Sequence, residues 1–476
     1  MAEFYSASRS ASRALFVLAL LGSLIGTNIL IAGVGIRGLL LTLIILALVM
    51  PIGLRLIQRK LDLFEPLVLA NIALGVMFIA RPLADLATGR TTHLGYEIVS
   101  TFDQALVVVL VGIMAFQLGY HSPLVRLLAK RLPAPTQFYP QRAALLAWLF
   151  VLLGGALFGM FLAKGGGLGL LLFLLKGRAT GDNAVFINST GYFYDGITMW
   201  MASALIFFAL AIVVRRKAYY IFFLTMAFPL IIFYGSRGTR SVLLPLVLAV
   251  PIFWYLWIAR RPSARVLIAA ALIGLALIGW MREIRTADMS ARQDAGTVLL
   301  EAFSSPLKQA WEIINKADDE MFDSITNELL VVPEKTGYRP GGVFIDVITR
   351  AVPRPLWPDK PLGMNNTLVN TLWPKHFAAS RASAAFSVLG PLYLDSGYIG
   401  VALGMFLIGV VLAGVWKWYC YFSDNLNAIL IYSLGLPFVV ILMRGTITDT
   451  LARMLFIVVP LILVMWFSRL RLTQGK

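Results

Sequence analysis

The sequence predicts an all-α polytopic membrane protein with about twelve transmembrane helices. Hydrophobic residues occupy 59% of the 476 positions, and the mean hydropathy is +0.81. Soluble domains contain roughly 45–50% apolar residues, so lipid is the expected solvent for most of this chain. Apolar runs of about 20 residues recur along the sequence, and each is long enough to cross a bilayer as a helix.

Twelve apolar runs can be followed from one end of the chain to the other. The fifth is followed by three consecutive glycines and the apolar stretch 168–175, which fits either part of a span or a re-entrant segment. The runs begin near Arg13, Gly38, Asp62, Gln104, Arg142, Asp195, Lys217, Arg240, Ala264, Gly397, Asn427 and Leu451.

Basic residues in the short connections predict the orientation of these spans. With a cytoplasmic N-terminus, the inner connections and the C-terminus carry 19 Lys and Arg residues, against 10 in the outer ones. Cytoplasmic connections are typically the more basic, so we expect both termini in the cytoplasm of a bacterial cell with the protein in its inner (cytoplasmic) membrane. The net charge of +17 therefore reflects topology and does not indicate a nucleic-acid partner.

One long segment, residues 282–385, differs from the rest because it has the composition of a water-soluble protein. It holds 12 basic and 13 acidic residues and lies between the ninth and tenth spans. We expect a single membrane domain over residues 1–476 that carries this segment as an inserted periplasmic loop. Cys420 is the only cysteine, which excludes an intrachain disulfide. A large extramembrane loop in such a chain indicates that chemistry takes place there.

Two arginines three residues apart, Arg237 and Arg240, lie at the start of the eighth span on the side that is otherwise poor in positive charge. Residues at this spacing share a helical face, and a helix N-terminus offers unpaired N–H groups to an anion. The planar guanidinium group suits phosphate oxygens. The pair is therefore either an anion site or two side chains that reach to the membrane surface.

The loop contains the run Pro-Arg-Pro-Leu-Trp-Pro-Asp-Lys-Pro, in which prolines fix the backbone. Arg354, Trp357 and Lys360 would project from this stiff strip, just after Arg350, and could bind a substrate; a structural clamp is the alternative. His376 is a candidate general base or an exposed histidine.

The last external turn and the re-entry of the loop supply further ionisable candidates. Arg444, Asp449 and Arg453 lie at the ends of two spans, where they form either a site or an anchoring ion pair. Asp395 is a lone carboxylate where the loop returns to the membrane, and it is a candidate catalytic group.

No cofactor or metal site is predicted. The three histidines are far apart, no phosphate-binding or dinucleotide-binding glycine motif is present, and the first external loop, around residues 33–37, has no carboxylate. We therefore expect metal-independent chemistry in which arginines provide the positive charge.

The order of these motifs resembles the Wzy-type O-antigen polymerases, also called oligosaccharide repeat-unit polymerases. The resemblance covers residues 234–453: a mid-chain Gly-Thr-Arg turn, a loop with Leu-Trp-Pro-Asp-Lys-Pro, a Ser-Gly run into the next span and a late Arg-Gly. It implies a glycosyltransferase of the C-type membrane architecture. By motif position, the family's basic residues correspond to Arg237, Arg240, Arg354, Lys360 and Arg444, whereas the motif match does not fix which carboxylate or histidine acts as the general base.

The resemblance also implies the partners. These are undecaprenyl-diphosphate-linked oligosaccharides as donor and acceptor, membrane lipid, and a separate chain-length regulator protein, with the active site facing the periplasm. The expected activity is polymerisation of glycan repeat units. An O-antigen ligase that transfers glycan to lipid A core and a lipid-linked oligosaccharide transporter are the alternatives.

Overall fold

The computed structural model describes residues 2–175, 186, 191–237, 239–286, 305, 308, 311–312, 320–350, 352, 357, 359–380 and 385–467. Inside some helices only the backbone is described, and Arg240 and His376 are among these residues. Arg354 lies outside the described residues.

Within these residues the chain is a polytopic helical membrane protein with ten helices long and apolar enough to span a bilayer. Ten of the twelve predicted spans overlap one of these long helices, and the other two differ from the prediction. The eighth predicted span is a shorter apolar helix over Ser241–Trp257, and the twelfth is divided into two helices. Pro460 explains the division, because proline lacks the N–H group and its ring clashes with the preceding turn.

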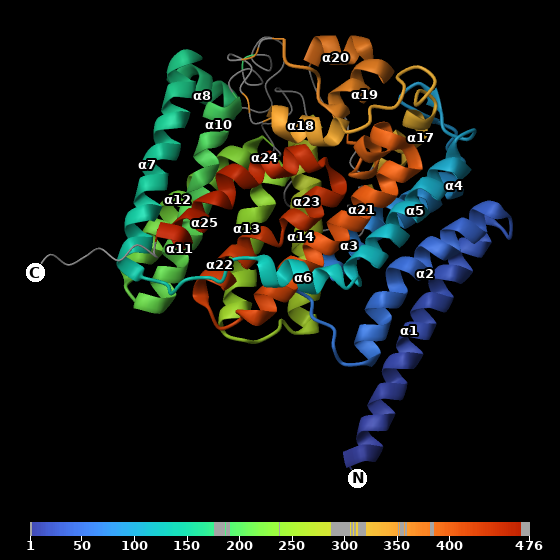
Figure 1. Cartoon of the computed structure of the whole chain (residues 1–476), viewed down its shortest axis with the longest axis horizontal. Coiled ribbons are helices and arrows are strands. Elements are labelled where there is room, and N and C mark those ends of the chain that lie inside the picture. Colours follow the sequence, from blue (N-terminus) through green and yellow to red (C-terminus); the bar gives the residue numbers. More distant parts are fainter. Residues whose placement is uncertain are drawn as a thin grey trace, which may run out of the picture.

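In the first half of the chain, α1, α2, α4 and α5 lie on one side of the bundle, and α7 and α8 lie on the opposite side (Figure 1). Helices α1 and α2 form a hairpin of which α2 packs on α5. The bounds are α1 Ala2–Ala32, α2 Ile36–Ile57, α3 Pro66–Gly75, the π-helix η1 Val76–Ala80, α4 Arg81–Thr88, α5 Phe102–Tyr120, α6 Leu124–Arg131, α7 Pro140–Lys164 and α8 Leu168–Leu175. Helices α3, η1 and α4 together make one span, Pro66–Thr88.

The second half begins with α10 and ends with α25. Its membrane helices are α10 Gly191–Asp195, the 3-10 helix η2 Gly196–Thr198, α11 Met199–Val214, α12 Lys217–Ser236, α13 Arg240–Trp257, α14 Ala264–Thr286, α21 Leu389–Tyr421, α22 Leu426–Gly435, α23 Phe438–Arg444, α24 Ile447–Ile457 and α25 Val459–Phe467. Helices α5 and α21 pack closely because glycines remove side chains from their contact. A Cβ atom at Gly119 would lie 2.0 Å from the carbonyl oxygen of Phe406.

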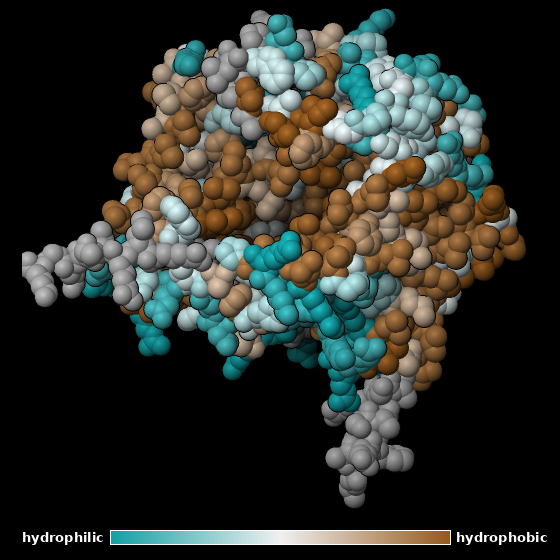
Figure 2. All heavy atoms as spheres, in the orientation of Figure 1, coloured by the Kyte–Doolittle hydropathy of each residue, from teal (hydrophilic) through white to brown (hydrophobic). Residues whose placement is uncertain are grey.

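The described part of the inserted loop covers the end of the bundle opposite the N-terminus (Figure 1). It contains α17 Met321–Leu329, α18 Gly342–Arg350, α19 Met364–Leu372 and α20 Pro374–Ser380, and the hairpin of β1 Thr92–His93 and β2 Tyr96–Glu97 contacts α17. Hydrophobic residues form a broad band across the middle of the molecule, with hydrophilic residues gathered at both ends (Figure 2). One part of the loop is less solvated than its composition suggests, because every residue of α17 is buried.

Helix α21 changes direction soon after the chain leaves the loop. Ser396 and Gly397 have non-helical backbone angles, and Gly397 has a φ of +61°. Only glycine adopts this left-handed conformation without steric cost. The bend separates Asp395, at the end of the first segment, from the long membrane helix that follows.

Candidate functional site

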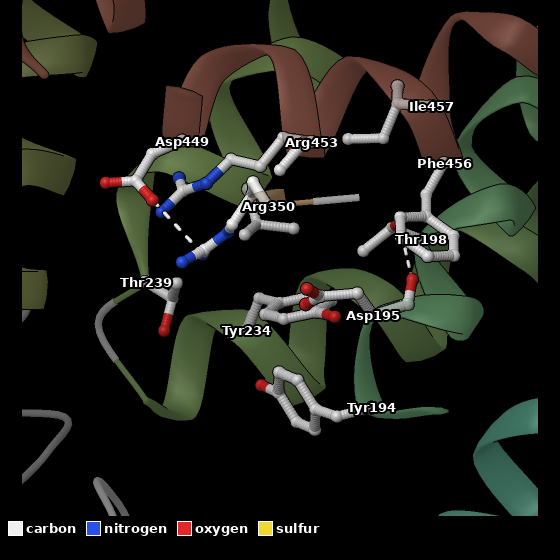
Figure 3. Close-up of a pocket in the computed structure, with 12 residues that line it drawn as sticks. Tyr194, Asp195, Thr198, Tyr234, Thr239, Arg350, Asp449, Arg453, Phe456 and Ile457 are labelled. Atoms are coloured by element: carbon white, nitrogen blue, oxygen red, sulfur yellow. Dashed lines mark hydrogen bonds and ion pairs between the residues drawn. The ribbon is translucent and has the colours of Figure 1, made fainter. Parts of the chain in front are cut away.

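A cavity of about 160 Å³ lies where the loop meets the ends of the membrane helices. Its lining comes from α10 and η2, the end of α12, the start of α13, the last residue of α18 and helix α24. Figure 3 shows Arg350, Asp449 and Arg453 on one side of this cavity, with Asp195 and Tyr234 on the other. The pocket therefore combines positively charged groups with carboxylates at the boundary between membrane and loop.

Arg350 and Asp449 form an ion pair on one side of the pocket. Nη2 of Arg350 lies 3.1 Å from Oδ1 of Asp449, and the two side chains are 49% and 42% exposed. Asp449 is in the first turn of α24, where Thr446 caps the helix by accepting a hydrogen bond from its N–H group. A carboxylate near a helix N-terminus and a cation near a helix C-terminus both interact favourably with the helix dipole, so the two helix ends suit this pair.

Two aspartates hold α18, which carries Arg350. Asp346 accepts hydrogen bonds from the N–H of Met364 at 3.2 Å and from the hydroxyl of Thr448 at 3.2 Å. Burial raises the pKa of Asp346, and these two hydrogen bonds oppose the rise. Asp395 accepts a hydrogen bond from the N–H of Val343 at 3.1 Å, in the first turn of α18. The predicted catalytic residue Asp395 therefore caps a helix and is not among the residues that line the cavity.

Arg237 lies behind the pocket wall. It is 7% exposed, and its Nη1 donates a hydrogen bond of 2.5 Å to the hydroxyl of Tyr194, which lines the cavity. Its guanidinium also lies over the rings of Tyr194, at 5.1 Å, and Phe233, at 5.6 Å. Arg240 begins α13 directly beside Thr239, another lining residue, but its side chain is not described.

Arg453 follows Asp449 by one helical turn, so both residues share a face of α24. Its Nη1 atom is buried and has no hydrogen-bond partner among the described residues. Buried guanidinium donors are almost always hydrogen-bonded in folded proteins. An acceptor supplied by a ligand in the cavity would satisfy this donor.

Asp195 is the functional candidate that the sequence did not single out. It lies at the junction of α10 and η2 and lines the cavity, and its charged neighbours are Arg453, Arg350, Asp449 and Arg237. Among the described residues its carboxylate has no hydrogen bond or ion pair; the bond from the Thr198 hydroxyl goes to its backbone oxygen. The sequence signal for Asp195 was its position as a lone acidic residue at the start of a predicted span, after two tyrosines and before a glycine. Tyr194 and Tyr234 were missed as well.

The other predicted residues whose side chains the structure describes are not among those that line this cavity. Lys360 donates a hydrogen bond of 3.0 Å to the carbonyl of Val352, and Trp357 is 40% exposed. Arg444 is the last residue of α23 and is absent from the lining. His376 lies in α20, where only its backbone is described. The structure therefore joins Arg350, Asp449 and Arg453, and the described residues of the proline-rich strip are not among those that line the cavity.

A second group of charged residues joins the loop to the membrane helices. Arg81 is fully buried, and its guanidinium contacts Asp323 of α17 at 2.5 Å and Asp85 at 3.3 Å. His93 Nδ1 lies 3.3 Å from the same Asp323 carboxylate, and burial lowers the pKa of this histidine. This cluster anchors α17 to α4 and to the β-hairpin.

No group of three or more His, Cys, Asp and Glu residues in the described part of the chain is arranged to hold a metal ion. Comparison with family models, curated proteins and solved structures gives no match to this chain. The chemistry that the pocket supports is therefore inferred from its own residues: two arginines able to bind an oxygen-rich anion, opposite a carboxylate without a protein partner in the described structure.

Proposed function

We propose that this chain is a membrane glycosyltransferase that polymerises polyprenyl-diphosphate-linked oligosaccharide repeat units into O-antigen or a related surface polysaccharide. The observation that carries the proposal is the buried Nη1 donor of Arg453, which has no hydrogen-bond partner in the described part of the chain, in a pocket shared with Arg350 and Asp195. The order of sequence motifs from residue 234 to residue 453 supports the same reaction class.

The proposed reaction needs the positive charge that the pocket contains. A hydroxyl oxygen of the acceptor sugar bonds to the anomeric carbon of the donor, and the bond from that carbon to the lipid diphosphate breaks. The electron pair of the broken bond passes to the diphosphate, whose negative charge grows in the transition state. Fixed cations that meet this charge lower the barrier, and loss of one such contact typically costs about 3 kcal/mol.

The place of the pocket also suits a lipid-linked substrate. Arg350 comes from the loop, whereas Asp195 and Tyr234 belong to helices that span the membrane. A polyprenyl chain can stay in the apolar band while its diphosphate reaches this boundary and its glycan extends toward the loop helices. The C-type architecture, the bacterial inner membrane and a periplasmic location of the site are parts of this proposal.

The test is glycan extension by the purified protein in lipid nanodiscs, with undecaprenyl-diphosphate-linked repeat units as both donor and acceptor. The expected result for wild type is a ladder of longer glycans. Arg350→Ala and Arg453→Ala should each lower the rate about 100-fold, which corresponds to the loss of about 3 kcal/mol of transition-state stabilisation.

Arg216→Ala is the matched control, because Arg216 is an exposed arginine in the connection between α11 and α12. Its activity should equal that of wild type. Failure of the wild-type protein to extend any glycan would overturn the proposal, and so would full activity in both pocket variants. Transfer to lipid A core alone, without extension of repeat units, would assign the ligase reaction instead.

A further inference from the structure

The two carboxylates that line the pocket differ in their partners. Asp449 is paired with Arg350 at 3.1 Å and is fixed in the capped first turn of α24. The carboxylate of Asp195, in contrast, makes no hydrogen bond or ion pair with the described residues, although arginines on the opposite wall lie within electrostatic reach. A carboxylate that no protein donor holds is free to bind a donor on a ligand.

We propose that Asp195 is the catalytic base that accepts the proton of the acceptor sugar hydroxyl. This inference rests on the proposed glycosyl transfer. The diphosphate of the donor would lie against Arg350 and Arg453, and the acceptor hydroxyl would bind to Asp195 on the opposite wall (Figure 3). The anomeric carbon then lies between the leaving group and the attacking oxygen, as a direct displacement requires.

The pocket and its two substrates supply every group that the transfer requires. The acceptor oxygen forms the new bond to the anomeric carbon while its proton moves to a carboxylate oxygen of Asp195. The bond between the anomeric carbon and the diphosphate oxygen breaks, and its electron pair leaves with the diphosphate. The protonated Asp195 then returns its proton to water.

Three other candidates for this role are already engaged. Asp449 is bound to Arg350, and Asp395 caps α18 through Val343. The Tyr194 hydroxyl accepts the hydrogen bond from Arg237. The positive charge of Arg350 and Arg453 opposes protonation of Asp195, and a bound diphosphate compensates this charge. Asp195 is then the lining group best placed to take a proton. General bases in this position typically contribute about 10²–10⁴ to the rate.

The experiment compares Asp195→Asn and Asp195→Glu with wild type in nanodiscs. Three quantities are measured: the turnover of repeat units, the Kd for the fluorescently labelled lipid-linked donor, and the pH profile of kcat/KM. We expect Asp195→Asn to lower turnover about 100-fold or more while the donor Kd changes less than about threefold. Asp195→Glu should keep part of the turnover and shift the acidic limb of the profile, because the new carboxylate occupies a different position.

Asp424→Asn is the control, since Asp424 is an exposed carboxylate in the connection between α21 and α22. Turnover of Asp195→Asn close to that of wild type would overturn the assignment. Equal losses of turnover and donor binding would do the same, because they would make Asp195 a donor-binding residue. A covalent glycosyl adduct on Asp195 in the wild-type protein, detected by mass spectrometry, would identify a nucleophile rather than a base.

The two proposals can fail separately. Absence of glycan extension by the wild-type protein removes the glycosyltransferase function itself. Extension by wild type together with extension by Asp195→Asn removes only the role of Asp195. If Asp195→Asn does not fold, the pH profile of Asp195→Glu decides, and a profile identical to that of wild type contradicts the inference.

Discussion

The guanidinium of Arg350 and the carboxylate of Asp449 lie 3.1 Å apart, across the contact between the inserted loop and the last membrane helices. Both side chains are nearly half exposed. Exposed ion pairs contribute only about 0–1 kcal/mol to stability. The pair therefore contributes little to the stability of the fold, and its main effect is to orient Arg350 over the pocket.

This relationship predicts an effect on activity without a matching effect on stability. Asp449→Asn should shift the melting temperature in detergent only slightly, since the pair contributes at most about 1 kcal/mol. Glycan extension should fall about tenfold, because Arg350 loses the partner that orients it. The measurement is a double-mutant cycle with Arg350→Ala. Independent, additive effects of the two substitutions on activity would show that the pair does not act as a unit.

Arg237 is predicted to support the pocket through Tyr194. Tyr194→Phe removes the acceptor of the 2.5 Å hydrogen bond and leaves a buried guanidinium donor unpaired, which should destabilise the protein by about 1–3 kcal/mol. Arg237→Lys should rescue Arg237→Ala poorly, because lysine lacks the planar group that lies over Phe233. Thermal melts and glycan extension are the two measurements. Full recovery of both by lysine would contradict the geometric role.

The buried pair of Arg81 and Asp323 is predicted to hold the loop to the bundle. Asp323→Asn leaves Arg81 without its 2.5 Å partner, and breaking a buried ion pair typically costs about 3–5 kcal/mol. The double variant Arg81→Met with Asp323→Leu should be less destabilised than either single change, because both charges of the pair are removed and the remaining buried carboxylate, Asp85, still has Arg90 at 3.8 Å. Arg37→Ala is the control: its pair with Asp103 is partly exposed, at 32% and 42%, so its loss should cost about 1 kcal/mol or less. Equal losses of stability in Asp323→Asn and Arg37→Ala would refute the role of the buried pair in holding the loop to the bundle.

Glu328 predicts a dependence of stability on pH. Both of its carboxylate oxygens are buried without a hydrogen-bond partner among the described residues, and burial raises its pKa well above the usual range. The folded state then binds the proton more tightly than the unfolded state. The stability from this group is present below the unfolded pKa of about 4.3 and is lost as the pH rises toward the folded pKa.

Glu328→Gln should therefore melt at a higher temperature than wild type at about pH 8, and the difference should shrink toward about pH 5. The comparison is made at equal pH, because His93, whose pKa is lowered, contributes with the opposite sign in acid. A difference that stays constant over this interval would contradict the raised pKa of Glu328.

Glycan extension is predicted to survive removal of divalent ions. The arginines of the pocket supply the positive charge that a metal would otherwise provide to the leaving diphosphate. Activity in excess EDTA should equal activity in added Mg²⁺. Loss of turnover in EDTA and its recovery with Mg²⁺ or Mn²⁺ would require a metal, with Asp449 and Asp195 as the first ligands to examine.

The sequence alone determined the helical membrane class, the approximate positions of the spans and the place of the loop between α14 and α21. These features follow from the local composition of the chain, because hydrophobic length and charge decide whether a segment enters lipid. The sequence also contains Pro460, where the last span divides into two helices. The prediction of a single span did not take this proline into account. The arginines Arg350 and Arg453 and the carboxylate Asp449 were also recognised as candidates from their positions near span and loop ends.

Only the tertiary structure decided which of these side chains share a pocket. Arg350 enters it because Asp346 ties its helix α18 to α19 and α24, and Asp395 of α21 caps the start of that nine-residue helix. Asp195 becomes a candidate base only when its position opposite Arg453 is known. Composition and spacing are local properties of the chain, whereas the proximity of a carboxylate to a guanidinium depends on the packing of helices that are distant in sequence.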